Sequence, residues 1–313
     1  MREQSIREQV GRMLGEEERW AVAKSVVTGL DTGFPSINLI TGGLHAGELT
    51  VLGARTSHGK TSLGISIAFH AAIEGLKDGN NRPVLFFSPE MTAAQLLHRY
   101  ACQVAEVPGE VLRRGIANED QRGRYREAVQ MLNSMEGYLR LFAGQSMSAT
   151  EIVDTIEETV QDGVTPALVV VDYIQRLNAD EGGSASDYAR LSQISTTLKD
   201  AANTYEIPFL VLSQLSRGIE KDRQNARGGE ERPPSLSDLR GSGRIEEDAD
   251  SVWLLWRPPL RQSHADDTPQ KATLVIEKNR NGPVGAAALQ FIPRLTLFVD
   301  GGERKVRTDG GHE

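Results

Sequence analysis

The sequence predicts an α/β fold in which a largely parallel central sheet carries helices on both faces and antiparallel strands at one edge. Short apolar runs alternate with helical patterns from residue 28 onward, as in a parallel sheet whose strands are joined by crossover helices. Several runs are apolar throughout, which is typical of strands covered on both faces. The expected strands are LTVLG at 49, VLFFS at 84, ALVVVD at 167, FLVLSQ at 209, VWLLW at 252 and TLVIEK at 273.

Helical periodicity is clearest in segments between these strands. Apolar residues recur at helical spacing at Ile152, Ile156 and Val160, and again from Leu191 to Tyr205. The residues MTAAQLLHRY, which follow the second expected strand, also have the pattern of a helix. Because each of these segments lies between two expected strands, each can cover a face of the sheet.

A further amphipathic helix is expected near the N-terminus. Ile6, Val10, Met13 and Leu14 share one helical face, and an acidic run after Gly15 then interrupts the apolar stripe. A helix this short needs a partner surface to be stable. It either packs on its own domain or is a linker helix that docks on a neighbouring subunit, and the pattern favours neither.

The last apolar runs, after residue 270, predict antiparallel hairpins at one edge of the sheet, because short turns such as NRNGPVG and IPRL separate them. Segments 178–187 and 217–235 are rich in charge, Gly or Pro and are expected to be mobile loops. The expected organisation is therefore a linker helix over 1–27, one α/β domain over 28–303 and a flexible tail over 304–313.

The composition is that of a soluble globular protein. The 313 residues are 39% hydrophobic, and no run approaches the roughly 20 apolar residues that a membrane span needs. The charged N-terminus lacks the apolar core of a signal peptide, so we expect a cytoplasmic protein without a membrane partner. The net charge of −8 argues against a protein that coats nucleic acid with its whole surface, but it allows a locally basic channel. The single cysteine, Cys102, is expected to be buried and unreactive.

The stretch LTVLGARTSHGKTS leads an apolar strand through a Gly-Lys-Thr loop into an apolar-periodic segment, which is the context of a phosphate-binding loop. Backbone N–H groups and the positive end of the following helix would hold the β- and γ-phosphates, with Lys60 as a point charge and Thr61 as a ligand of Mg²⁺. Ala54 stands where the usual pattern has its first glycine, so an incidental loop is the alternative. The residues expected to contact nucleotide are Ala54, Arg55, Thr56, Ser57, His58, Gly59, Lys60, Thr61 and Ser62.

Three polar side chains follow the ends of other expected strands, at the edge where parallel sheets bind ligands. Asp172 could hold Mg²⁺ directly or through water, or it could cap the next turn. Glu90 could polarise an attacking water, or it could be a charge favoured at the start of the next helix. Gln214 could sense the γ-phosphate or orient water, and capping is again the alternative.

Two cations lie close together near the end of the chain. Lys278 and Arg280 occupy alternate positions of the segment EKNRNGP, which places them on one face of a strand. At a sheet edge they could reach a phosphate in a neighbouring subunit, as arginine fingers do. A solvated surface is the alternative for this pair.

Together these segments resemble the C-terminal ATPase domain of the bacterial replicative helicase family of the DnaB type, a RecA-like motor. The resemblance runs from about residue 28 to residue 300 and includes the alanine at the first position of the phosphate loop. The family normally has a helical domain before its linker helix, whereas only residues 1–27 precede the motor here. The motifs that carry the resemblance, in family order and spacing, are TGLDTGFPSINLITGGLHAGELTVLGARTSHGKTS, FFSPEM, VVVDYIQ, VLSQLSRGIE, SDLRGSGRIEEDAD and EKNRNGPVG.

The resemblance implies a RecA-like P-loop NTPase that assembles as a ring homohexamer with ATP and Mg²⁺ bound between subunits. Lys60 and Thr61 would then bind phosphate and Mg²⁺, and Asp172 would support the metal. Glu90 would activate water, and Gln214 would couple the γ-phosphate to the DNA loops.

Other positions acquire expected roles in the same way. Lys278 and Arg280 would act in trans on the nucleotide of the next subunit, and Arg99 matches a family arginine near the nucleotide. A further segment, in which Gly241 replaces an acidic residue that is common in the family, corresponds to a loop that grips the backbone of single-stranded DNA. Its residues are Arg240, Gly241, Ser242 and Gly243.

The expected function is thus an ATP-driven helicase motor that translocates 5′ to 3′ on single-stranded DNA, with primase or a helicase loader as further partners. A RecA-like recombinase or regulator that hydrolyses ATP without unwinding is the runner-up, and such proteins lack the RGSGRIEEDAD segment in this register. A non-catalytic assembly module is the third reading. The presence of Lys60, Glu90, Asp172 and Arg280 argues against it.

Overall fold

The structure is a computed structural model, and it describes the greater part of the chain. Most of each expected loop, 178–187 and 217–235, lies outside the described residues, as does the expected tail 304–313. The described residues are 5–7, 10–11, 13–15, 17, 26–179, 186–215, 233–258 and 268–301.

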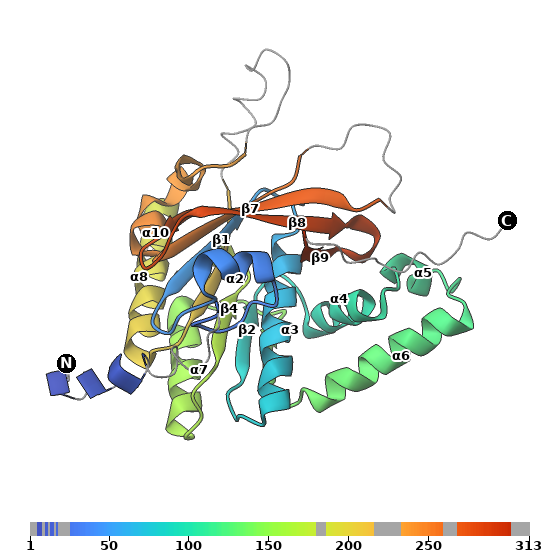
Figure 1. Ribbon diagram of the computed structural model, residues 1–313, viewed down its shortest axis with the longest axis horizontal. Coiled ribbons are helices and arrows are strands. Elements are labelled where there is room, and N and C mark those ends of the chain that lie inside the picture. Colours follow the sequence, from blue (N-terminus) through green and yellow to red (C-terminus); the bar gives the residue numbers. More distant parts are fainter. Residues whose placement is uncertain are drawn as a thin grey trace, which may run out of the picture.

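One sheet forms the centre of the described part, with its strands in the order β3-β2-β4-β5-β1-β6-β7-β8-β9 (Figure 1). The strands from β3 to β6 in this order are parallel, whereas β7, β8 and β9 pair antiparallel at one edge, as predicted. The strands are β1 Leu49–Ala54, β2 Val84–Ser88, β3 Leu139–Ala143, β4 Leu168–Val171, β5 Phe209–Gln214, β6 Ser251–Trp256, β7 Gln270–Asn279, β8 Gly285–Ile292 and β9 Leu297–Asp300.

Helices connect these strands and begin at well-defined caps. Thr92, Asn118 and Ser148 each form a capping box with the residue three positions later, which fixes the first turns of α4, α6 and α7. The helices are α2 Pro35–Thr41, α3 Lys60–Asp78, α4 Ala93–Ala105, α5 Gly109–Arg113, α6 Glu119–Ser134, α7 Ala149–Gln161, α8 Asp187–Tyr205 and α10 Gly243–Asp248, with short 3₁₀ turns η1 Ile174–Arg176, η2 Leu236–Ser242 and η3 Pro293–Leu295.

The core consists of two apolar layers, one on each face of the sheet. Because side chains alternate along a strand, Phe86 of β2 joins the layer under α2, α3 and α4. Leu85 and Phe87 of the same strand join the layer under α7, α8 and α10. Figure 1 shows these two groups of helices on either side of the strands. The predicted helices on both faces are thereby confirmed.

The strand β3 is absent from the sequence-based expectation. Its five residues, Leu139–Ala143, are all partly exposed, since they pair with β2 at the outer edge of the sheet. Its sequence, LRLFA, is interrupted by Arg140 and lacks the continuous apolar character by which the inner strands were identified. An edge strand of this kind is defined by its pairing partner more than by its own pattern.

The N-terminal segment is helical at every described residue between 6 and 17. Its apolar stripe is open to solvent, with Ile6 81%, Met13 66% and Leu14 61% exposed. The alternative in which this helix buries its stripe on its own domain is therefore wrong for these residues.

The carboxyl ends of the central parallel strands meet at one edge of the sheet. Ala54 of β1 is paired with Gln214 of β5, and Val171 of β4 with Phe87 of β2. The segments that follow these four strands therefore converge, and this is the edge where open parallel sheets bind ligands. Among the described residues, no helix has the length and apolar content needed to cross a membrane.

Candidate functional site

The loop between β1 and α3 has the backbone geometry of an anion cradle. Ser57 and Gly59 have positive φ angles of 65° and 93°, so the chain curls back before α3 begins at Lys60. A Cβ atom at Gly59 would lie 2.7 Å from the ring of Phe298, which leaves room only for glycine. The first N–H groups of α3 have no partner within the helix, so they can bind an anion in the loop.

Lys60 is a largely buried cation at the centre of this cradle. Its ammonium lies 3.9 Å from the centroid of the Tyr173 ring. Burial lowers the pKa of Lys60 to about 8, although the nearby carboxylates of Asp172 and Glu90 favour its charged form. A desolvated ammonium of this kind gains strongly from a phosphate oxygen, because the anion replaces water that folding has removed.

Thr61 and Asp172 form the polar pair expected for a magnesium ion held with a nucleotide. The Thr61 hydroxyl donates to Oδ1 of Asp172 over 3.1 Å. Asp172 is fully buried, and its Oδ2 has no hydrogen-bond partner among the described residues. Burial accordingly raises the pKa of Asp172. A hydroxyl and an uncompensated carboxylate suit Mg²⁺, which usually takes one or two protein ligands in addition to phosphate oxygens and water.

The described residues contain no cluster of three or more His, Cys, Asp or Glu side chains that could bind a metal without a nucleotide. Thr61 and Asp172 offer one hydroxyl and one carboxylate, which leave most of the coordination sphere of Mg²⁺ to phosphate oxygens and water.

Glu90 lies beside the cradle and is exposed to solvent. It follows β2 and precedes Thr92, whose hydroxyl already accepts from the backbone N–H of Gln95 and caps α4. The start of α4 therefore does not depend on Glu90 for a cap, which weakens the structural alternative for this residue. An exposed carboxylate within the electrostatic reach of Lys60 can accept a proton from a water that approaches the γ-phosphate position.

Gln214 connects the end of β5 to the cradle. Its side-chain Nε2 donates to the hydroxyl of Thr56 over 2.8 Å. Its backbone N–H donates to Oε1 of Gln175 over 3.0 Å, and its carbonyl accepts from Nε2 of the same glutamine over 3.2 Å. Gln214 therefore does not cap a helix, and its amide is positioned to respond to an anion in the loop.

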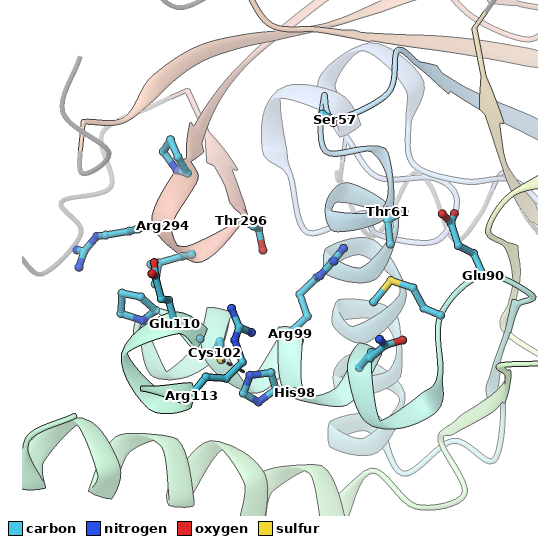
Figure 2. Close-up of a pocket in the computed structure, with 16 residues that line it drawn as sticks. Ser57, Thr61, Glu90, His98, Arg99, Cys102, Glu110, Arg113, Arg294 and Thr296 are labelled. Atoms are coloured by element: carbon cyan, nitrogen blue, oxygen red, sulfur yellow. Dashed lines mark hydrogen bonds between the residues drawn. The ribbon is translucent and has the colours of Figure 1, made fainter. Parts of the chain in front are cut away.

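Two cavities open at this edge. The smaller, of about 260 Å³, is lined by the cradle together with Glu90, Tyr173 and Gln214. The larger, of about 940 Å³, extends from Thr61 to α5 and η3. Arg99 lines both, and burial lowers the pKa of its guanidinium against the attraction of Asp172 and Glu90. In Figure 2, Arg99 extends into the space between Thr61 and the η3 turn, with Glu90 beyond Thr61.

Cys102 lies in the wall of the larger cavity. It is 4% exposed, so the expectation of a buried thiol is confirmed. Burial raises the pKa of this thiol to about 11, which agrees with the prediction that it is unreactive.

The structure also identifies a residue that sequence reasoning missed. Arg257 follows β6 at the same edge, and one of its terminal nitrogens donates to the carbonyl of Ser57 over 2.5 Å. Its backbone N–H donates to Nδ1 of His58 over 3.3 Å, and its guanidinium lies 3.9 Å from the ring centroid of Phe291. Arg257 thus supports the backbone of the cradle. Its position directly after an apolar strand is the one signal that could have identified it.

Lys278 and Arg280 lie at the amino ends of the central parallel strands. This edge is opposite the carboxyl edge, where the strands end and the cradle lies. Lys278 is near the end of β7, next to the start of β6, whereas Arg280 lies in the turn after the strand rather than within it. The strand β1, Leu49–Ala54, separates this edge from the cradle by about 20 Å at about 3.3 Å per residue. Neither cation can reach the cradle of its own subunit.

The segment expected to bind DNA has helical secondary structure, whereas a loop was expected. Residues 240–242 are the end of η2, and Gly243 begins α10. The side chains of residues 240–242 lie outside the described part of the structure. The expected contact of Arg240 with DNA stays a prediction.

Comparisons with known proteins agree with this geometry. Residues 29–300 match the family described as "DnaB-like helicase C terminal domain". The chain is 32% identical over 277 residues to the replicative DNA helicase DnaC of Bacillus subtilis, covering 88% of this chain and 58% of the relative. It is also 32% identical over 274 residues to the replicative DNA helicase DnaB of Geobacillus stearothermophilus, covering 88% and 57%.

Solved structures show the same likeness. One that is described as an ATPase domain superposes with a TM-score of 0.80 at 27% identity, over 96% of this chain and 99% of that one. A DnaB-like replicative helicase, described with its interactions with primase, gives a TM-score of 0.76 at 26% identity, over 95% and 67%. The chain spans about three fifths of the length of the curated relatives that it matches. Sequence, fold and site geometry together place this chain in the family of DnaB-like helicase C-terminal domains.

Proposed function

We propose that the chain is the motor of an ATP-dependent DNA helicase, which translocates 5′ to 3′ on single-stranded DNA as a ring homohexamer and hydrolyses ATP at the subunit interfaces. The observation that carries the proposal is the separation of the two halves of the site. One edge of the sheet holds a phosphate cradle, and the opposite edge holds Lys278 and Arg280. A head-to-tail contact between copies would bring the two edges together, and repetition of such a contact gives a ring when the rotation between copies closes.

Each residue at the cradle has a distinct chemical task in this proposal. The N-terminus of α3 and Lys60 bind the β- and γ-phosphates of ATP. Gln214 contacts the γ-phosphate and couples its presence to the end of β5. Glu90 accepts a proton from the attacking water, and Arg99 stabilises negative charge beside it. Thr61 and Asp172 hold Mg²⁺, which neutralises phosphate charge when it is bound.

The second half of the site comes from the neighbouring copy. Lys278 and Arg280 neutralise charge that develops on the transferred phosphoryl group, as cations supplied in trans do in related phosphoryl-transfer reactions. Hydrolysis therefore depends on assembly. A solitary subunit would bind nucleotide but would lack the groups that stabilise the transition state.

The proposed DNA contact is made by the segment 240–243, through Arg240 and main-chain N–H groups. Recognition of backbone rather than bases would tolerate any sequence and would weaken steeply with salt. The linker helix within residues 1–27 would bury Ile6, Met13 and Leu14 on an adjacent subunit, which their exposure supports. Primase or a helicase loader is the further partner that we propose, and the cytoplasm is the proposed location.

The direct test measures ATP hydrolysis and particle size together. We expect hydrolysis to be stimulated by single-stranded DNA and to appear only in fractions whose mass by light scattering is that of a ring. Lys60→Ala is the control, because it should assemble without turnover. A monomer that hydrolyses ATP at the full rate would contradict the shared site, and an assembled protein with no turnover on any DNA would leave only a structural role.

A further inference from the structure

Asp250 is a buried carboxylate at the edge of the sheet opposite the cradle, and its two oxygens have different partners. Oδ1 accepts from the guanidinium of Arg280 over 3.0 Å. Oδ2 accepts from the ammonium of Lys199 over 2.7 Å and from the backbone N–H of Leu49 over 2.8 Å. The Asp250 side chain is 8% exposed, whereas that of Arg280 is 50% exposed. The guanidinium is therefore anchored through one terminal nitrogen, while half of the arginine side-chain surface remains open to solvent.

The backbone adds to this anchor. The N–H of Asp250 donates to the carbonyl of Leu49, and the N–H of Arg280 donates to the carbonyl of Asp250, each over 2.9 Å. Asp250 is thus fixed to the first residue of β1, and the turn that carries Arg280 is fixed to Asp250. Because β1 leads directly to the cradle, the anchor is tied to the strand at the centre of the fold.

The carbonyl end of α10 holds the two cations in a common orientation. A second guanidinium nitrogen of Arg280 donates to the carbonyl of Glu247 over 2.9 Å. The Lys278 ammonium donates to the carbonyls of Glu246 and Glu247 over 2.6 and 3.3 Å. The last carbonyls of a helix lack partners within the helix and carry partial negative charge, so they favour cations.

We propose that Asp250 is the positioning residue for Arg280, and that with the carbonyl end of α10 it holds both cations ready for the nucleotide of the next subunit. This inference rests on the proposed function, because it gives Asp250 a role in a reaction completed between subunits. A free arginine side chain samples many rotamers, and fixing it beforehand removes that entropy loss from the catalytic step. Asp250 itself touches no reacting atom.

The decisive variant is Asp250→Asn, with Lys199→Gln as the matched control. The amide replaces one accepting oxygen with a donor, so either Arg280 or the Leu49 and Lys199 donors lose their acceptor. Lys199→Gln breaks the other ion pair of the same carboxylate but leaves the Arg280 contact intact. We expect Asp250→Asn to lower kcat about tenfold to a hundredfold, the size of effect that misplacement of a reacting group gives, with little change in KM for ATP. Lys199→Gln should change kcat less than about twofold, since it leaves that group in place.

A subunit-mixing experiment separates a positioning role from general damage. Asp250→Asn subunits keep an intact cradle, and Lys60→Ala subunits keep intact cations, so their mixed interfaces contain complete sites. Mixed oligomers should therefore hydrolyse ATP faster than either variant alone. Melting temperatures measured on the same samples show whether Asp250→Asn is folded under the assay conditions, and the mixture reports on function even if the variant is less stable.

A mixture of Arg280→Ala and Lys60→Ala subunits distinguishes failure of the Asp250 inference from failure of the proposed function. The positioning role is overturned, and the proposed function stands, if Arg280→Ala is complemented by Lys60→Ala but folded Asp250→Asn is not complemented. The same conclusion follows if Asp250→Asn has wild-type kcat. If Arg280→Ala itself is never complemented at any ratio, the shared site fails, and with it the proposed function. Equal losses of kcat in Asp250→Asn and Lys199→Gln would also contradict the inference, since they would indicate a purely structural carboxylate.

Discussion

The two edges of the central sheet differ in how their buried charges are satisfied. At the carboxyl edge, Asp172 has one oxygen without a hydrogen-bond partner among the described residues, and Lys60 is desolvated against an aromatic ring. At the opposite edge, both oxygens of Asp250 are occupied by cations and a backbone N–H. The Arg280 side chain there donates both to Asp250 and to a carbonyl at the end of α10.

The contrast shows what each edge is built for. A buried charge without full compensation is costly to the folded protein, and it is retained where a ligand supplies the missing partner. The carboxyl edge therefore has the character of a binding site for a charged ligand. A fully satisfied network instead fixes side chains in one arrangement. The opposite edge has the character of a rigid support for groups that act elsewhere.

The largest expected effect concerns Glu90, the carboxylate that we propose as the catalytic base at the carboxyl edge. Glu90→Gln should lower kcat for ATP hydrolysis by about 10²- to 10⁴-fold, because a neutral amide cannot accept the proton of the attacking water. The affinity for nucleotide, measured by titration calorimetry, should change little. Glu110→Gln is the control, since Glu110 lines the far part of the larger cavity and pairs with Arg114. Equal rates for Glu90→Gln and wild type would remove Glu90 from the reaction.

The same substitution at the two edges should have opposite effects on stability. Asp172→Asn is expected to raise the free energy of unfolding or leave it unchanged at pH 7. Folding raises the pKa of Asp172, so its ionised form destabilises the fold as pH rises through that range. Asp250→Asn should lower the free energy of unfolding by about 3 kcal/mol, because it removes the anionic partner of the mostly buried Lys199.

Urea denaturation of both variants without nucleotide measures this difference. A loss of stability in Asp172→Asn as large as that in Asp250→Asn would mean that the two edges are equally satisfied, and the comparison would fail.

Nucleotide affinity should fall with pH above 8 because of Lys60. Folding lowers the pKa of Lys60 to about 8 in the absence of nucleotide, and a bound phosphate favours the protonated ammonium. Above that pH the protein must therefore take up a proton at Lys60 when it binds nucleotide. Kd for ADP should rise about tenfold between pH 7 and 9. Lys60→Arg keeps its charge over this range and should show a flat profile. A flat profile in the wild type would indicate that Lys60 remains protonated without nucleotide.

The smallest expected effect concerns the segment next to α10. Arg240→Ala should weaken single-stranded DNA binding several-fold, equally for all sequences, and should reduce the slope of log Kd against log salt by about 1. Fluorescence anisotropy over a range of salt concentrations measures both quantities. Arg126→Ala, which changes an exposed arginine of α6, is the control. An unchanged slope for Arg240→Ala would exclude a phosphate contact by this side chain.

Much of the fold and part of the site could be predicted from sequence because their signals are local. The inner strands are continuous apolar runs, and the cradle is a contiguous segment that contains Lys60 and Thr61. Asp172, Glu90 and Gln214 were predicted to lie near it because each directly follows such a run, and the structure brings all three to the cradle. The strand β3, Leu139–Ala143, was missed because an edge strand depends on a distant partner.

Other parts of the site could not be predicted, because they depend on contacts between distant segments. Asp250 lies within an acidic run that has the appearance of a solvated surface, yet it is buried and paired with Lys199. Arg257 contacts the cradle through Ser57, which lies 200 residues earlier in the chain. The sequence pattern predicted Arg280 to lie on a strand. In the structure it lies in the turn after β7, and a hydrogen bond to a carbonyl at the end of α10 orients its side chain.

The sequence by itself predicted the order of the inner strands along the chain, the segment expected to bind phosphate and the residues expected to act at the carboxyl edge. These follow from periodicity and from residue types at adjacent positions, which are properties of short segments. Only the tertiary structure decided that Lys278 and Arg280 are held at the edge away from their own cradle, and that Asp250 anchors the arginine. That arrangement depends on sheet order and register, which bring residues 30 to 201 positions apart into contact.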